Sequence, residues 1–202
     1  MKVIVVGVGK VGRNILQCLV EESHDIVVVD QNAEAVQTVV DRYDVMGLCG
    51  NGCIAENLKE AGADTADLVI SVTPSDEQNV LCCLIAKSLG AKNTIARVRD
   101  PEYNQQSAFM RDKLGIGRLV NPDKALAEEI TRLLRFPSAE KISTFAEGKV
   151  EIVEMKIPVG SIMAGKKLSE INTGKKRFSI LIAAVERDGN IVVPNGDTVL
   201  KE

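Results

Sequence analysis

A glycine-rich turn near the start of the chain constrains the fold more than any other feature. The run Gly7-Val8-Gly9-Lys10-Val11-Gly12 directly follows the apolar residues 3–6 and opens a segment, residues 11–20, with helical periodicity. A G-x-G-x-x-G motif between a strand and a helix is typical of dinucleotide-binding folds. Gly7 would permit the tight turn, Gly9 the close approach of a pyrophosphate, and Gly12 the close packing of helix on strand.

The main-chain amides at the start of such a helix have no acceptor within the helix. Together with the positive end of the helix dipole, they favour the binding of phosphate groups. We therefore expect all six residues of the motif to take part in binding a nucleotide. The alternative is a tight turn without a ligand.

Strand-like and helical segments alternate along the first two thirds of the chain. Short apolar runs predict buried strands, and apolar residues at helical spacing predict the helices between them. Six such units with short connections are typical of an α/β, Rossmann-like doubly wound parallel sheet. The predicted strands are residues 3–6, 26–29, 44–48, 68–72, 94–98 and 118–120, and the predicted helices are residues 11–20, 33–40, 54–61, 76–89, 102–113 and 122–134.

This alternation stops at the segment Arg135-Phe136-Pro137-Ser138. Beyond it we predict strands over residues 150–157 and 180–185, a short helix over residues 164–171, and a hairpin turn at Asp188-Gly189-Asn190 that leads into residues 191–193. The predicted domains are a nucleotide-binding domain, residues 1–136, and a small α+β domain, residues 137–202. A domain of about 65 residues has a marginal core. We expect this second domain to be incomplete, or to be completed by another chain.

Asp30 ends the second predicted strand, 23 residues after Gly7. A carboxylate at this position of a dinucleotide-binding fold accepts hydrogen bonds from ribose hydroxyls. Gln31 follows it, so no arginine is available there for a 2′-phosphate, which Asp30 would repel. The sequence therefore favours NAD or an adenine nucleotide over NADP.

Polar residues follow two further predicted strands, and the carboxyl ends of parallel strands open onto one cleft. Asn51 and Gly52, within Gly50-Asn51-Gly52, are placed to lie beside an adenine. For the segment Thr73-Pro74-Ser75-Asp76, two interpretations stay open: contact with a ligand, to which Thr73 and Pro74 would contribute, or capping of the next helix by Ser75 or Asp76.

Two arginines, Arg97 and Arg99, flank the end of the fifth predicted strand. Guanidinium groups bind phosphate oxygens in pairs, so arginines at this edge of the sheet suit a phosphate chain. The alternative is that they form surface salt bridges.

The charge balance and the cysteines exclude several classes of function. The 202 residues carry 25 Lys and Arg against 28 Asp and Glu, and aromatic residues make up 3%. Nucleic-acid binders usually present a basic face or stacking aromatics, so we expect no nucleic-acid partner. The five cysteines contain no C-x-x-C pair and lie far from the single histidine, His24, so neither a disulfide framework nor a zinc site is expected. Cys82 and Cys83 fall in an apolar helical run and are expected to be buried.

The hydropathy pattern contains no apolar run of 18 residues and no signal peptide at its start. Such a chain is expected to be soluble and intracellular.

A nucleotide site of this kind first suggests a dehydrogenase, which needs acid–base groups beside the nicotinamide. His24 falls in the predicted loop between the first helix and the second strand, at the opposite edge of the sheet from the cleft. Neither Tyr43 nor Tyr103 has a lysine four residues further on, and no large substrate domain follows. Binding without catalysis is therefore the preferred interpretation, and a small NAD-dependent oxidoreductase is the alternative. A redox-sensing repressor is disfavoured because no winged-helix segment is present.

Five features occur in order along the first domain: the glycine motif, Asp30, Gly50-Asn51-Gly52, the run Val72-Thr73-Pro74-Ser75-Asp76-Glu77-Gln78-Asn79 and the run Ile95-Ala96-Arg97-Val98-Arg99-Asp100-Pro101-Glu102-Tyr103. Together they resemble the TrkA proteins, nucleotide-binding regulatory subunits of bacterial and archaeal potassium uptake systems, whose domains are also called KTN or RCK domains. The C-terminal part resembles the family's regulatory domain from Gly160-Ser161 to Leu168 and at Val193-Pro194-Asn195-Gly196-Asp197-Thr198.

The resemblance implies a regulatory ligand, NAD(H) or an adenine nucleotide (ATP, ADP or AMP), in a cleft formed by the glycine loop, Asp30, Asn51, Thr73 and Arg97. Asn79 would support this cleft or serve the helix alone.

The resemblance also implies how such a protein acts. Family members assemble as homo-oligomers, here through the sheet face and residues 122–134. They dock at the inner face of the cell membrane, on a potassium channel or transporter subunit of the TrkH/KtrB type. The family's small domain continues beyond the point that corresponds to residue 202, and many members repeat both domains in tandem, which implies that this chain matches the first half of such a protein.

Overall fold

A computed structural model describes residues 1–146, 148–171 and 181–202 of the chain. They form two compact units, Met1–Glu128 and Glu129–Glu202. The division falls within helix α7 (Pro122–Arg135), whereas the boundary expected from the sequence, between residues 136 and 137, follows that helix.

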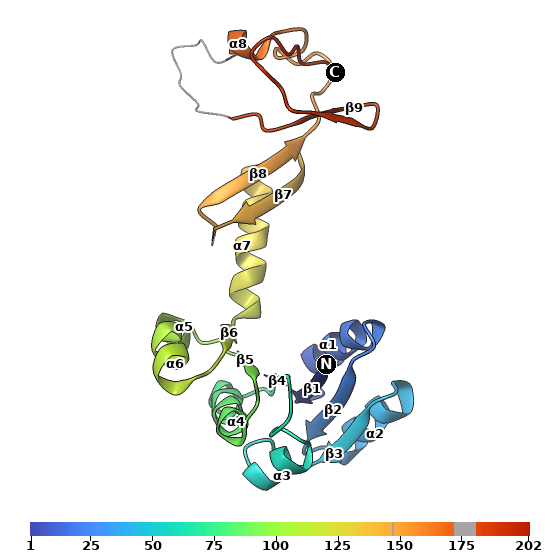
Figure 1. Ribbon diagram of the computed structural model, residues 1–202, viewed down its shortest axis with the longest axis vertical. Helices are drawn as coiled ribbons and strands as arrows, with labels where there is room; N and C mark the ends of the chain where they lie inside the picture. The colour runs from blue at the N-terminus through green and yellow to red at the C-terminus, as the bar shows by residue number, and fades with distance from the viewer. Residues whose placement is uncertain (147, 172–180) are drawn as a thin grey trace. The chain divides into compact units, whose positions relative to one another are not determined.

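A six-stranded parallel sheet organises the first unit (Figure 1). Its strands are β1 (Lys2–Val6), β2 (Asp25–Asp30), β3 (Met46–Cys49), β4 (Leu68–Ser71), β5 (Asn93–Arg97) and β6 (Arg118–Val120). They lie in the order β3-β2-β1-β4-β5-β6, and Val5 of β1 pairs with Val28 on one side and Ile70 on the other. The strand order therefore reverses between β1 and β4, which is where sheets of this class leave a crevice at their carboxyl edge.

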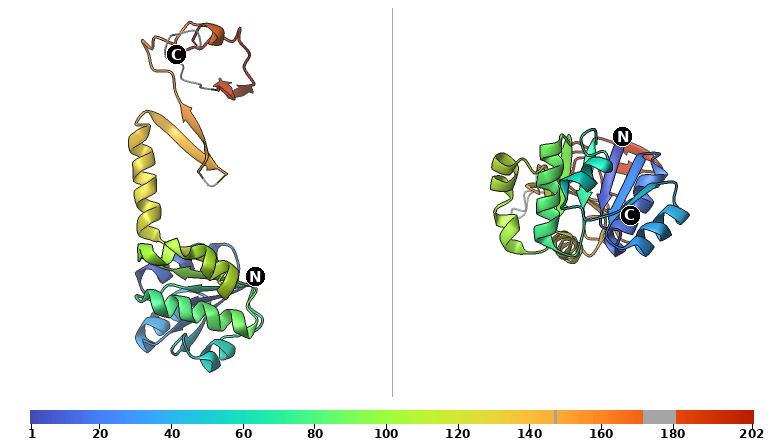
Figure 2. Two further views of the ribbon diagram at one scale, coloured as in Figure 1. Left: turned by 90° about the vertical axis from the view of Figure 1, so that its left-hand side faces the viewer. Right: turned by 90° about the horizontal axis from the view of Figure 1, so that it is seen from below.

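Helices cover both faces of this sheet (Figure 2). They are α1 (Lys10–Glu21), α2 (Ala33–Arg42), α3 (Ala55–Glu60), α4 (Asp76–Leu89), α5 (Pro101–Gln105), α6 (Ser107–Leu114) and the start of α7. Because side chains alternate between the two faces of the sheet, β1 contributes residues to two hydrophobic cores. Val5 packs in one core with Leu16 of α1 and Val36 of α2, and Ile4 packs in the other with Leu58 of α3 and Ala86 of α4. Burying such a side chain contributes about 1.5–3 kcal/mol.

The predicted doubly wound α/β fold with a small second domain is confirmed, with one change in the first unit. The helix predicted over residues 102–113 is two helices, α5 and α6, which are separated at Gln106. The Gln106 amide donates to the carbonyl of Tyr103 in a tight turn, and the carbonyl of Gln106 accepts from the amide of Met110 to start α6. Gln106 carries no glycine or proline signal, which is why the sequence pattern did not predict the break.

The second unit contains two antiparallel hairpins. Strand β7 (Ala139–Phe145) pairs with β8 (Val150–Met155), and β9 (Val185–Arg187) pairs with β10 (Asn190–Val192). The predicted hairpin turn is present: Asp188 and Gly189 have φ of 50° and 75°, as a tight two-residue turn requires. Strand β7 was not predicted, because its sequence, in which Ile142 and Phe145 are the two large apolar residues, has neither a continuous apolar run nor an apolar–polar alternation.

Two expectations for the second unit were wrong in extent. The helix expected over residues 164–171 is only α8 (Leu168–Ile171), because Gly165 adopts a positive φ of 79° that an α-helix excludes. The strand expected over residues 180–185 is not formed at residues 181–184, and the side chain of Leu181 is 90% exposed there. Residue 180 lies outside the described residues.

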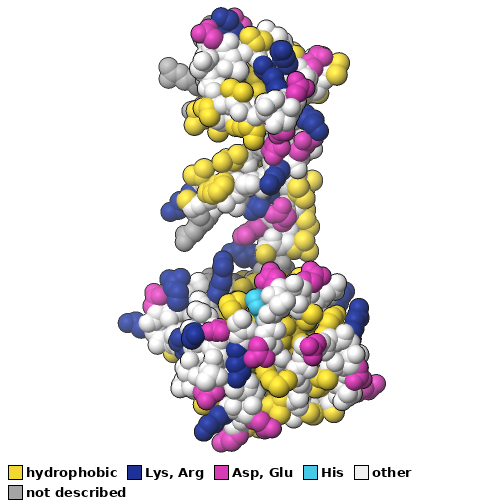
Figure 3. Space-filling view, turned by 45° about the vertical axis from the view of Figure 1, so that its right-hand side comes forward, with side chains coloured by type: hydrophobic (Ala, Val, Ile, Leu, Met, Phe, Trp, Pro, Cys, Tyr) yellow, Lys and Arg dark blue, Asp and Glu magenta, His cyan; other side chains and the backbone are white. Residues whose placement is uncertain are grey.

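Burial differs sharply between the units. Among the described residues of the second unit, Leu200 is the one apolar side chain that is buried. Apolar residues of β7 and β8, such as Phe145 and Ile152, are exposed, and Figure 3 shows apolar side chains on this hairpin. Two-stranded sheets are only marginally stable in water, and the described part of the second unit buries little apolar surface of its own. No helix within the described ranges is both long enough and apolar enough to span a bilayer.

Candidate nucleotide-binding site

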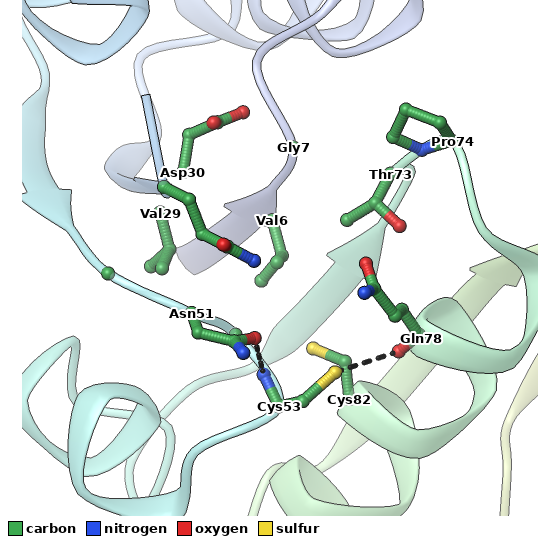
Figure 4. A pocket seen from close by; sticks show the side chains of 13 residues that line it. Val6, Gly7, Val29, Asp30, Asn51, Cys53, Thr73, Pro74, Gln78 and Cys82 are labelled. Carbon is green, nitrogen blue, oxygen red and sulfur yellow. Dashed lines mark hydrogen bonds between the residues drawn. The ribbon is translucent and has the colours of Figure 1, made fainter. Parts of the chain in front are cut away.

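A cavity of about 440 Å³, measured with its open mouth, lies at the carboxyl edge of the sheet where the strand order reverses (Figure 4). Segments that end β1, β2, β3 and β4 form its wall, and α4 closes one side. Its lining consists of Val6, Gly7, Val29, Asp30, Gln31, Gly50, Asn51, Gly52, Cys53, Thr73, Pro74, Gln78 and Cys82. Six residues expected from the sequence are in this lining: Gly7, Asp30, Asn51, Gly52, Thr73 and Pro74.

The glycine loop joins β1 to α1 beside this cavity. Gly7 has a φ of +96°, and a Cβ there would lie 2.9 Å from the amide nitrogen of Thr73. A Cβ on Gly12 would overlap the carbonyl oxygen of Gly7, so the helix packs directly on the turn. At Gly9 no atom lies within 4 Å of an added Cβ. Gly7 and Gly12 are thus required by the fold, whereas Gly9 borders open space that a phosphate can enter.

The start of α1 offers unpaired donors. Gly9 caps the helix without a side-chain hydrogen bond, and the first amide bonded to it is that of Arg13, 3.0 Å from the Gly9 carbonyl. The amides of Lys10, Val11 and Gly12 precede that bond and have no acceptor within the described chain. These amides and the positive end of the helix dipole favour an anion.

Asp30 connects the end of β2 to the glycine loop. Its Oδ2 accepts a hydrogen bond from the amide of Val8 at 2.8 Å, and its Oδ1 accepts one from the amide of Asn32 at 2.9 Å. Its carbonyl accepts from the amide of Gly50 at 2.9 Å. Because a carboxylate has about four lone-pair sites, two remain for the hydroxyls of a ribose.

Asn51 is held in a fixed orientation after β3. Its Oδ1 accepts from the amide of Cys53 at 2.9 Å, and its carbonyl accepts from Nδ2 of Asn57 at 3.0 Å. Gly52 packs against the side chain of Val6, which leaves no room for a Cβ. The loop therefore presents the amide of Asn51 to the cavity from a tightly packed backbone.

Asn79, wholly buried at the start of α4, ties two strand ends together. Its Oδ1 accepts from the amide of Thr73 at 2.7 Å, from the hydroxyl of Thr73 at 2.8 Å and from the hydroxyl of Ser71 at 3.0 Å. Its Nδ2 donates to the carbonyls of Thr73, at 3.0 Å, and Arg97, at 2.9 Å. Thr73 thus forms a rigid part of the cavity wall.

The segment Thr73-Pro74-Ser75-Asp76 borders the cavity and also caps the next helix. Thr73 and Pro74 line the cavity. Ser75 caps α4, because its hydroxyl accepts from the amide of Gln78 at 3.2 Å.

Arg97 ends β5 and Arg99 follows it; both lie outside the cavity lining, and their hydrogen bonds differ. Nη2 of Arg99 donates to the carbonyl of Pro74 at 2.6 Å, and its Nε lies 3.9 Å from Oδ1 of Asp76, which matches the salt-bridge alternative. Arg97 is half-buried, and its Nε is buried without a hydrogen-bond partner in the described residues. A buried donor left unpaired costs about 1–3 kcal/mol, so Arg97 is the arginine whose hydrogen-bonding capacity the described residues leave open.

Sequence reasoning missed part of the lining, notably Gln78, Cys53 and Cys82. Gln78 and Cys82 are four residues apart and lie on one face of α4, a spacing that could have pointed to them. Burial raises the pKa of the Cys82 thiol to about 12 and also raises the pKa of the Cys53 thiol. Both thiols are therefore neutral at physiological pH and act as apolar wall. Cys82 and Cys83 are buried, as expected.

The chemistry available at the cavity is that of binding. Its lining contains one carboxylate, that of Asp30, together with amides, a hydroxyl and thiols. His24 lies before β2, at the opposite edge of the sheet, with Nε2 3.1 Å from Oε2 of Glu22. Among the described residues, no group of three or more His, Cys, Asp or Glu side chains could hold a metal ion.

The strand order and the glycine loop define the class of this protein: a Rossmann-type α/β domain with a cavity at its switch point. The chain belongs to the TrkA family. Residues 3–122 match the TrkA-N domain, and residues 152–202 match the TrkA-C domain.

Curated relatives share the whole length of this chain. It is 35% identical over 201 residues to the Trk system potassium uptake protein TrkA homolog of Archaeoglobus fulgidus, and 33% identical over 204 residues to the Trk system potassium uptake protein TrkA of Vibrio alginolyticus. The alignments cover 100% of this chain but only 45% and 44% of those proteins. The chain thus spans about half the length of these relatives.

Solved structures share the fold at low identity. The GsuK channel matches 99% of this chain, and 35% of its own, with a TM-score of 0.63 and 21% identity. The GsuK channel bound to NAD matches the same shares with a TM-score of 0.59 and 22% identity. The Kef CTD of Shewanella denitrificans in its AMP-bound form matches 67% of this chain, and 82% of its own, with a TM-score of 0.52 and 18% identity.

Proposed function

We propose that this chain is a nucleotide-binding regulatory subunit of a potassium uptake system. It binds NAD(H) or an adenine nucleotide (ATP, ADP or AMP) and gates a membrane potassium channel subunit by changing conformation. The observation that carries the proposal is the cavity at the switch point, where the carboxylate of Asp30 lies one hydrogen bond from the loop that starts α1. Support comes from relatives named for potassium uptake and from fold neighbours with bound NAD and AMP.

In the proposed complex, the adenosine ribose donates hydroxyl hydrogen bonds to Asp30. The phosphates lie against the free amides at the start of α1, over the open space beside Gly9. Thr73 forms the facing wall. A longer phosphate chain reaches further, toward the unpaired Nε of Arg97. The contacts to Asp30, to the start of α1 and to Arg97 each use a group that the described residues leave unsatisfied or only partly used.

Regulation requires a ligand that binds two conformations with unequal affinity, typically by about 1–3 kcal/mol of coupling. Asn79 bonds both Thr73 in the cavity wall and the carbonyl of Arg97 on β5. A displacement of Thr73 by the ligand is therefore coupled to the end of the neighbouring strand. Nucleotides with different numbers of phosphates would displace Thr73 by different amounts. Such a difference would favour one conformation of the protein over the other.

We further propose that the protein works as a homo-oligomer. Helix α7 exposes Leu126, Ile130, Leu133 and Leu134, which recur at helical spacing, with Leu126 61% and Leu134 74% exposed. A stripe of this kind on a helix is typical of a surface that packs on another helix. Association of copies would cover this stripe.

The proposed site of action is the cytoplasmic face of the cell membrane. There the subunit would be held by a potassium channel or transporter subunit of the TrkH/KtrB type. The alternative is a small NAD-dependent oxidoreductase. That reaction needs an acid–base group beside the nicotinamide, and Asp30 is the one carboxylate in the described lining of the cavity.

Potassium flux tests the proposal. A potassium channel or transporter subunit of the TrkH/KtrB type is placed in liposomes, and ⁸⁶Rb⁺ uptake is measured with and without the chain in the presence of ATP, ADP or NADH. We expect flux to change by severalfold between nucleotides only when the chain is present, and to lose this dependence with Asp30→Ala. Hydride transfer to or from NAD(H) by the purified chain, with no nucleotide effect on flux, would support the oxidoreductase instead.

A further inference from the structure

A free amide group lies on the α4 side of the cavity. Gln78 has both main-chain groups held: its N–H donates to the hydroxyl of Ser75 at 3.2 Å, and its carbonyl accepts from the thiol of Cys53 at 3.5 Å. Its side-chain amide makes no hydrogen bond to any residue that the structure describes. A donor and an acceptor are therefore presented to the cavity from a fixed backbone.

Asn51 presents a second amide with one defined free end. Because its Oδ1 is occupied by the amide of Cys53, its orientation is set and Nδ2 is the free group. Figure 4 shows Asn51 and Gln78 on opposite sides of the cavity, with Val6 between them. The cavity thus offers a donor on one side and a donor–acceptor pair on the other.

The rest of the lining combines the amide of Gln31 with apolar side chains and neutral thiols. The apolar part includes Val6, Val29, Cys53 and Cys82. Burial keeps both thiols protonated by raising the pKa of each. Apolar walls with a few convergent polar groups suit a flat heteroaromatic ring whose faces are apolar and whose edge forms hydrogen bonds.

We propose that Gln78 and Asn51 read the base of the bound nucleotide and select a purine with an amino group at C6. The proposal rests on the nucleotide site proposed above. Oε1 of Gln78 accepts from the amino group while Nε2 donates to the adjacent ring nitrogen, the pairing that glutamine makes with adenine. Nδ2 of Asn51 donates to another ring nitrogen, since adenine has three acceptor nitrogens and only this one donor group.

Two ligands that differ only in this amino group test the proposal. They are ADP and the 5′-diphosphate of purine riboside, titrated calorimetrically into the wild-type chain. We expect ADP to bind roughly tenfold more tightly, as the loss of one such hydrogen bond with its acceptor left unpaired implies. Equal affinities would overturn base reading while leaving the nucleotide site in place. Failure of both ligands to bind would overturn the nucleotide site, and this inference with it.

Three variants assign the preference to Gln78. In Gln78→Leu the two affinities should come within about twofold of each other. Gln78→Glu should keep the preference for ADP, because a carboxylate still accepts from the amino group. Gln31→Leu removes an amide from the same cavity next to Asp30 and should leave the tenfold ratio unchanged. A ratio that persists in Gln78→Leu would overturn the assignment. Gln78 is exposed, so its replacement is not expected to alter the melting temperature.

Discussion

The carboxylate of Asp30 accepts a hydrogen bond from the main-chain amide of Val8 across a distance of 2.8 Å. The acidic residue at the end of β2 therefore holds the glycine loop in place before any ligand arrives. In the proposed complex the same carboxylate binds the ribose, so one side chain both positions the phosphate loop and contacts the ligand. Asp30 is consequently the residue whose loss should affect every ligand.

Asp30→Ala should weaken the binding of NAD, ATP, ADP and AMP alike, by at least about tenfold, because charge-assisted hydrogen bonds to both ribose hydroxyls are lost. Asp30→Asn should recover part of this loss, because its one oxygen still accepts a hydrogen bond. Calorimetric titration of each nucleotide measures both effects. Unchanged affinity in Asp30→Ala would remove Asp30 from the site.

Substitution by alanine should have different effects at two glycines of the loop, lowering stability at Gly12 and weakening ligand binding at Gly9. Gly12→Ala places a methyl group against the carbonyl of Gly7 and should lower the free energy of unfolding by about 3 kcal/mol. Gly9→Ala projects into open space and should leave stability within about 0.5 kcal/mol while weakening phosphate-bearing ligands. Urea denaturation and nucleotide titration of both variants separate the two roles. Wild-type affinity in Gly9→Ala would place the phosphates elsewhere.

Arg97 and Arg99 form a second matched pair. Arg97→Ala should weaken ATP roughly tenfold more than AMP, because only the longer phosphate chain reaches its unpaired Nε. Arg99→Ala should leave the ratio of ATP to AMP affinity unchanged, because that guanidinium is already engaged by Pro74 and Asp76. Equal losses for all ligands in Arg97→Ala would count against this arrangement.

The thiols should alkylate in order of their exposure and pKa. A raised pKa means less thiolate at a given pH, so at pH 8 iodoacetamide should label the exposed Cys18 and Cys49 first and Cys53 more slowly. Burial raises the pKa of Cys82 to about 12, which leaves about one thiolate in ten thousand at pH 8, so it should stay unlabelled. The alkylation rate of Cys53 should rise with pH, because more of its thiol is then ionised.

ADP should slow the labelling of Cys53 but not that of Cys18, because Cys53 lines the cavity and Cys18 does not. Peptide mass spectrometry measures each rate. Two results would contradict the described geometry: alkylation of Cys82 as fast as that of Cys18, or an alkylation rate of Cys53 that is the same with and without ADP.

The sequence pattern was sufficient for the architecture of the first unit because burial on both faces leaves continuous apolar runs such as that of β1. Strand topology then placed Asp30, Asn51 and Thr73 at one edge. Gln78 and Cys82 could not be predicted as lining residues, because their position in the cavity wall depends on how α4 packs beside β1 and β4. The engagement of Arg99 by Asp76 is likewise a tertiary contact that a spacing of 23 residues does not reveal.

The second unit was less predictable for a physical reason. Its described strands are short or have both faces exposed, so no buried side enforces an alternating pattern. The Asp188-Gly189 turn could be predicted because its two residues tolerate the positive φ that a two-residue hairpin turn needs.

We propose that the cavity between β1 and β4 binds an adenine nucleotide and releases it unchanged. Isothermal titration of the purified chain with NAD, NADH, ATP, ADP and AMP, with the recovered ligand analysed afterwards by chromatography, tests it most directly. We predict saturable binding of several of these ligands, one per cavity, each recovered unchanged, and loss of that binding in Asp30→Ala. Absence of binding for all five, or recovery of an oxidised, reduced or hydrolysed nucleotide, would show that this cavity is not a site for nucleotide binding without catalysis.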